Sequence, residues 1–126
     1  MRYGIFIGAV LGALAVLIGA FAAHALKHTL SPASLAVLQT AVQYQFVHAL
    51  ALLLVVALAH YRRSRALFFA AGFFTLGTLL FSGSLYLLIL TPLKPGLITP
   101  VGGSLLVMGW LSLAYSAIST QQKHGD

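Results

Sequence analysis

Acidic residues and cysteine are nearly absent from this chain of 126 residues. The single acid is Asp126 at the end of the sequence, and there is no cysteine. Without cysteine the chain can form neither disulfides nor thiolate metal sites, and it has no thiol nucleophile. Without an internal carboxylate, a triad hydrolase and a transporter coupled through a buried acid are both poorly supported.

Charge of either sign is scarce, and apolar residues dominate. Charged residues make up 6% of the chain and hydrophobic residues 60%, and the mean hydropathy is +1.00. A soluble domain of this length would need a larger polar shell, so we expect the lipid bilayer to be the solvent. The net charge is +6, but the basic residues lie at the ends of apolar segments and show no aromatic interleaving. They are therefore expected to contact lipid headgroups and not nucleic acid.

Four apolar segments are each long enough to cross a hydrocarbon core of about 30 Å as a helix. They cover approximately residues 4–26, 32–60, 66–90 and 98–118. Only short connections separate them, so residues 1–126 are expected to form a single integral membrane domain. The predicted fold is all-α, a four-helix transmembrane bundle running up-down-up-down.

Helix starts and turns are visible between these segments. Ser31-Pro32 and Thr99-Pro100 each pair an N-cap residue with proline at the first helical position. Residues 91–96 contain two prolines and a glycine, which predict a turn.

The basic residues predict the orientation of the chain. With four spans, one side of the membrane receives Arg2, Arg62, Arg63, Arg65 and Lys123, and the other receives Lys27 and Lys94. This asymmetry predicts that both termini are cytoplasmic. Met1-Arg2, the apolar run and Ala23-His24-Ala25 also imitate a cleaved signal peptide. Because the run is long and rich in glycine, we expect the first segment to be retained.

Several runs resemble the domain-of-unknown-function 423 family, which includes transmembrane protein 256-like proteins. The matching runs are Gly19–Lys27, Thr40–Leu53, Leu80–Leu87, Gly96–Gly103 and Gly109-Trp110. They occur in order over nearly the whole chain, and Ala22 stands where the family more often has glycine. The resemblance implies a protein of the bacterial inner (cytoplasmic) membrane and supplies no reaction.

Small residues form a stripe along the first segment. At 100° per residue the stripe covers about 80° of the helix surface, and its members are Gly4, Gly8, Gly12, Ala15, Gly19 and Ala22. Such a stripe allows close approach of another helix in lipid. It predicts packing against a helix of the same chain or, as the alternative, a homo-oligomer interface.

Polar residues lie at membrane depth in the second and third segments. His48 is 12 residues from the end of its segment at residue 60, which places it about 18 Å deep. Tyr44 and Gln45 can share a face with His48, whereas Gln43 is turned away. One face of the third segment carries Thr75, Thr78, Ser82 and Tyr86.

These positions predict a polar pocket in the outer half of the bundle. Its expected members are His24, Tyr44, Gln45, His48, Ser82, Thr99, Gly102 and Gly103. Intramembrane ionisable residues favour a functional role, but hydrogen bonding between helices explains the same residues. Ligation of haem would use His24 and His48. The sequence predicts no other metal site, and the identity of any cofactor is unknown.

The role favoured by these observations is a membrane-embedded binding or accessory protein. They favour the absence of catalysis over an enzymatic role but do not decide whether a reaction is catalysed. One alternative is a redox protein that binds haem or quinone at the polar pocket. Another is a small oligomeric transporter or channel.

Overall fold

The computed structural model describes residues 2–119 and is built from helices alone over that range. The long helices are α1 (Arg2–His24), α2 (Pro32–Tyr61), α3 (Arg65–Leu90) and α4 (Ile98–Ser119), and a short 3-10 turn, η1 (Leu26–His28), follows α1. All four are long and apolar enough to cross a membrane. The predicted all-α fold with four transmembrane helices is confirmed.

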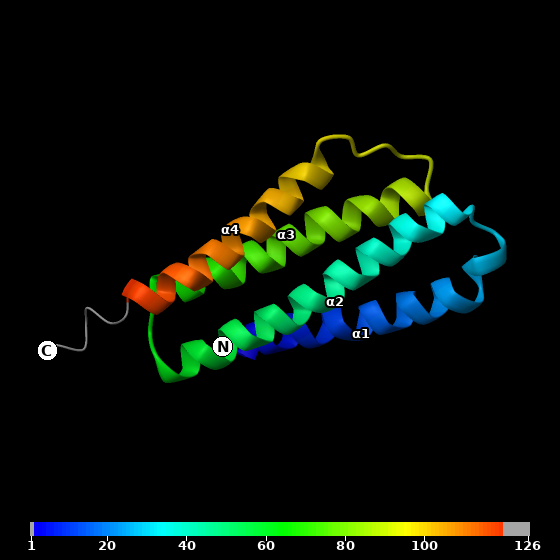
Figure 1. Ribbon diagram of the computed structural model, residues 1–126. Helices are drawn as coiled ribbons and strands as arrows, with labels where there is room; N and C mark the ends of the chain where they lie inside the picture. Colours follow the sequence, from blue (N-terminus) through cyan, green and yellow to red (C-terminus); the bar gives the residue numbers. More distant parts are fainter. Residues whose placement is uncertain (1, 120–126) are drawn as a thin grey trace, which may run out of the picture.

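The helices run antiparallel, and each packs mainly on the next one in the chain (Figure 1). Thus α1 packs on α2, α2 on α3 and α3 on α4. In contrast, α1 makes few contacts with α3 or α4. The bundle is therefore open between α1 and α3 instead of forming a closed ring.

One end of the molecule carries the arginines of the described chain. The start of α1 and the α2–α3 connection lie at this end (Figure 1), which brings Arg2, Arg62, Arg63 and Arg65 to the same side. We call it the arginine end. The α1–α2 and α3–α4 connections, with Lys27 and Lys94, lie at the opposite end. Lys123 and Asp126 lie outside the described residues.

Local hydrogen bonds explain where the helices begin. The Ser31 hydroxyl caps α2 by accepting from the Ser34 amide at 3.1 Å, and the next residue is proline. The expectation that Thr99 caps the fourth helix is wrong. The Val101 amide donates to the Leu97 carbonyl at 3.2 Å, so the helix begins earlier. The preceding turn contains Gly96 at φ +62°, a backbone conformation that glycine adopts without strain.

The apolar core lies between α2, α3 and α4 towards the arginine end. Val55 of α2, Leu67 and Phe74 of α3 and Leu106 of α4 are almost fully buried there. Glycines allow this close packing. A Cβ atom on Gly77 would lie 2.8 Å from the Leu106 side chain, and one on Gly109 would lie 2.6 Å from the Phe74 ring.

The small-residue stripe of α1 faces α2. A Cβ atom on Gly8 would lie 2.7 Å from the Leu53 side chain and 3.3 Å from the Ala49 carbonyl oxygen. Gly4 lies against Val56 in the same way, and Gly19 faces Val42. Because α2 already covers the stripe, an oligomer formed through these residues would have to displace α2.

Candidate functional site

A hydrogen-bonded chain at the centre of the molecule joins α1, α2 and α3. The amide nitrogen Nε2 of Gln45 donates to the Leu11 carbonyl of α1 at 2.8 Å. The Tyr86 hydroxyl of α3 donates to Oε1 of the same amide at 2.6 Å. Gln45 is only 4% exposed, so both ends of its amide are used inside the protein. It therefore joins three helices.

His48 joins α2 to α4. The Trp110 indole nitrogen donates to Nε2 of His48 at 3.0 Å, and Nδ1 of His48 lies 2.7 Å from the Tyr44 carbonyl of its own helix. The rings of His48, Trp110 and Phe74 also pack together, with Phe74 and Trp110 at 5.0 Å between centroids. This cluster fixes the approach of α4 to the centre of the bundle.

The partners of His48 determine which of its nitrogens carries hydrogen. An indole N–H can only donate, so Nε2 must offer its lone pair to Trp110. The hydrogen then lies on Nδ1 and is donated to the Tyr44 carbonyl. A haem iron needs a free ring nitrogen. Ligation by His48 would break the bond to Trp110.

Two of the four residues on the polar face of α3, Ser82 and Tyr86, bond to α2. The Ser82 hydroxyl donates to the Ala41 carbonyl of α2 at 2.7 Å, beside the Tyr86 bond to the same helix. The Thr75 hydroxyl donates to the Ala71 carbonyl of its own helix at 2.8 Å. The hydroxyl of Thr78 is buried without a hydrogen-bond partner among the described residues.

Thr99, Gly102 and Gly103 lie at a separate contact between α3 and α4. The Thr99 hydroxyl is 2.5 Å from the Ser84 hydroxyl. A Cβ atom on Gly102 would overlap the backbone of Phe81, whereas one on Gly103 would make ordinary contact with the Phe81 ring. These residues therefore bring two helices together.

His24 and Tyr44 occupy more exposed positions. His24 ends α1 and is exposed near the opposite end of the molecule. Tyr44 is 43% exposed. Its ring is tilted against the Phe81 ring at 4.7 Å between centroids and stacks on the His48 ring at 5.9 Å. The structure thus brings Gln45, His48, Tyr44 and Ser82 together on α2 and α3, and it leaves His24 apart.

Sequence reasoning missed two partners of the central residues. Tyr86 lies on the predicted polar face of α3 but was not among the expected pocket residues. Trp110 gave a weaker signal. An indole N–H usually finds a hydrogen-bond partner when it is partly buried, but this rule does not say which residue accepts the bond. Within residues 2–119, no three histidine, cysteine or acidic side chains are grouped to hold a metal ion.

A surface groove of about 710 Å³ lies between α1 and α3, over α2. It exists because α1 packs on α2 without packing on α3. Its lining residues are Tyr3, Gly4, Ile7, Leu52, Val55, Val56, Ala59, Arg63, Ser64, Leu67, Phe68, Ala71, Gly72, Thr75, Leu76 and Leu79. We call this the large groove. None of the expected pocket residues lines it.

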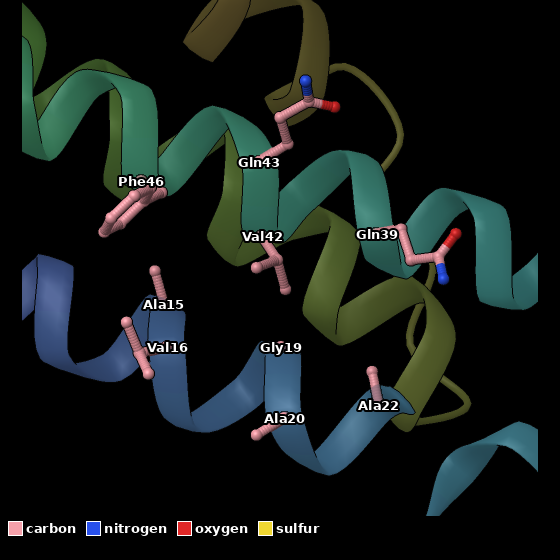
Figure 2. Close-up of a pocket in the computed structure, with 9 residues that line it drawn as sticks. All are labelled: Ala15, Val16, Gly19, Ala20, Ala22, Gln39, Val42, Gln43 and Phe46. Atoms are coloured by element: carbon pink, nitrogen blue, oxygen red, sulfur yellow. The ribbon is translucent and has the colours of Figure 1, made fainter. Parts of the chain in front are cut away.

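The small groove, of about 280 Å³, lies between α1 and α2 towards the opposite end. Figure 2 shows Val42 pointing from α2 towards Gly19 of α1, with the Gln43 side chain directed away from α1. Its floor is made by small residues of α1, including Ala15 and Ala20. The expected pocket residues are absent from its lining as well.

Comparison with known proteins agrees with this membrane architecture. Residues 18–103 match the family described as protein of unknown function (DUF423). The chain belongs to the DUF423 family. It is similar to the UPF0382 inner membrane protein YgdD of Escherichia coli K12, with 37% identity over 97% of this chain and 94% of that protein.

Further DUF423 relatives come from other bacteria. A UPF0382 membrane protein of Haemophilus influenzae is 40% identical over 87% of this chain and 89% of its own length. The Staphylococcus aureus protein SAB0533 is 40% identical over 90% of this chain and 93% of its own length. No solved structure matches this chain. The chain is thus a multi-pass membrane protein of a family whose members carry no assigned reaction in their names.

Proposed function

We propose that this protein is a non-catalytic binding protein of the bacterial inner membrane, and that it holds an amphiphilic molecule in the large groove. The observation that carries the proposal is the groove itself: an apolar recess of about 710 Å³ formed by three helices. Binding sites for small molecules are typically apolar recesses of this size with few polar groups.

The polar residues at the centre of the bundle support this placement of the ligand. The Gln45 amide and both ring nitrogens of His48 have partners inside the protein. Such bonds between helices contribute about 0.6 kcal/mol each on average in membrane proteins. The polar centre therefore serves to set the helix positions that form the groove.

Filling the groove tests the proposal. Gly72 lines the large groove, and a Cβ atom built on it has no neighbour within 4 Å. Gly83 of the same helix has equally open surroundings but lies outside both grooves. Gly72→Leu and Gly83→Leu gain the same helix propensity, so only the former changes the groove.

The measurement is native mass spectrometry of protein purified in a mild detergent. The wild type and Gly83→Leu should each retain an amphiphile from the membrane, and Gly72→Leu should lose it. Equal retention by all three proteins would show that no ligand occupies the groove. Circular dichroism spectra establish that the variants keep their helical content.

The proposal includes an orientation with both termini cytoplasmic. It is supported by the four arginines at one end of the described chain, because positively charged residues stay on the cytoplasmic side. Fusion of a reporter that is active only in the periplasm, at the α1–α2 and α2–α3 connections, tests it. Activity is expected at the first connection alone, and the reverse pattern would contradict the orientation.

A further inference from the structure

The charge and length of the large groove identify its occupant more closely, and this step rests on the proposed function. We infer that the groove holds one phospholipid with an acidic headgroup, taken from the leaflet at the arginine end. One of its two acyl chains lies along the groove, and its phosphate pairs with Arg63.

Charge complementarity supports an acidic headgroup. Arg63 lines the groove at the arginine end, and Arg2 and Arg65 are exposed at the same end. Residues 2–119 contain no acidic side chain that could neutralise them. The groove also begins beside Ser64, the N-cap of α3, where the helix dipole favours negative charge. Basic recesses between transmembrane helices are typical sites for anionic lipid headgroups.

The deeper wall of the groove matches an acyl chain. It is made of aliphatic and aromatic side chains such as Phe68, Leu76 and Leu79, which are exposed. The one hydroxyl in this part, on Thr75, is bonded to the Ala71 carbonyl of its own helix. This wall therefore has no unpaired polar group that needs a hydrogen bond from the bound molecule. Polarity is confined to the end that carries Arg63 and Ser64.

The length of the groove favours a lipid over a transmembrane helix of another protein as the occupant. From Leu67 to Leu79, the first and last groove residues of α3, the helix rises about 18 Å. One leaflet accounts for about half of a hydrocarbon core of about 30 Å. A helix would need a groove through the whole core, whereas a lipid needs one leaflet and its headgroup layer. The observed length fits the lipid.

The test uses protein in nanodiscs made from equal amounts of phosphatidylglycerol and phosphatidylcholine with identical acyl chains. Native mass spectrometry gives the ratio of the two lipids that remain bound. Arg63→Gln removes the charge that lines the groove. Arg65→Gln is the matched control, because Arg65 is exposed in the same region but does not line the groove.

The wild type should retain the acidic lipid preferentially. One arginine near a membrane surface contributes about 1 kcal/mol to binding of anionic lipid, which is about fivefold. Arg63→Gln should therefore lower the ratio about fivefold and still retain one lipid. Arg65→Gln should change the ratio by less than about twofold, since a charge outside the groove acts through screening solvent.

The other outcomes separate this inference from the proposed function. A wild-type ratio near one, or an equal loss in both arginine variants, overturns the headgroup assignment. In either case, loss of all bound lipid in Gly72→Leu would still support the groove as a binding site. Retention of lipid by Gly72→Leu would instead overturn the proposed function, and the present inference with it.

Discussion

Replacing Gly102 with alanine should push α4 away from α3. The added methyl group would overlap the backbone nitrogen of Phe81 and lie 2.8 Å from the Phe81 Cα atom. Real Cβ atoms essentially never approach other atoms closer than 3.0 Å. The obstructing atoms belong to the backbone, so no side-chain rotation can relieve the overlap. The helices must separate at this point.

The expected loss of stability follows from two opposing effects. Overpacking of this kind costs about 1–3 kcal/mol, and a gap of about 0.5–1 Å forfeits a quarter to a half of the dispersion energy at a contact. Because the obstruction is backbone, we take the upper end of the range. Alanine regains about 1 kcal/mol of helix propensity over glycine. The net loss for Gly102→Ala is therefore about 2 kcal/mol.

The adjacent glycine provides the control. A methyl group on Gly103 would lie 3.6 Å from the Phe81 ring, which is ordinary contact. Gly103→Ala should therefore keep the gain in helix propensity and be more stable than the wild type by up to about 1 kcal/mol. Unfolding of both variants by sodium dodecyl sulfate in mixed micelles, followed by circular dichroism, gives the comparison. Equal stabilities would refute the close approach of α4 to the α3 backbone.

Four further substitutions test the helix contacts by the same unfolding assay. Tyr86→Phe removes the donor to Gln45 Oε1 and should cost about 1–2 kcal/mol, because the amide oxygen stays buried without a partner; an unchanged stability would show that water replaces the hydroxyl. Trp110→Phe keeps an aromatic ring but removes the bond to His48, and a double-mutant cycle with His48→Phe should give a coupling of about 0.6 kcal/mol. A coupling of zero would mean that the two side chains do not interact. Gly8→Leu places a side chain against the Leu53 side chain and the Ala49 carbonyl of α2 and should cost about 1–3 kcal/mol; a neutral effect would place another face of α1 on α2.

The sequence is sufficient to predict the four transmembrane helices, because the signal is carried by each segment alone. About 20 apolar residues at 1.5 Å each cross the core whatever the other segments do. The Ser31-Pro32 cap was predictable for the same reason, since its hydrogen bond closes within three residues. The prediction that Thr99 caps the fourth helix was wrong. The Thr99 hydroxyl lies beside the Ser84 hydroxyl of another helix.

The candidate site was predictable only in part. Residue spacing placed Tyr44, Gln45 and His48 on a common face of α2, and the stacked rings of Tyr44 and His48 agree with this spacing. It could not show that Gln45 and His48 are already bonded within the protein, to Tyr86 and Trp110. These partners are 41 and 62 residues away.

The large groove was not predictable from residue types. Its lining residues, such as Leu67 and Leu76, read as ordinary lipid-facing or core positions of a transmembrane helix. The groove arises because α1 packs on α2 and makes few contacts with α3. Only the relative placement of three helices reveals it.

By itself, the sequence determined the membrane environment, the number of spans and the concentration of arginine at one end, since hydropathy and charge act segment by segment. The tertiary structure decided which polar groups meet and where a recess remains. The physical reason is that a helical pattern specifies a face but neither its partner nor the axial offset between helices. Those are set by close contacts such as Gly102 against Phe81 and Gly109 against Phe74, which exist only after folding.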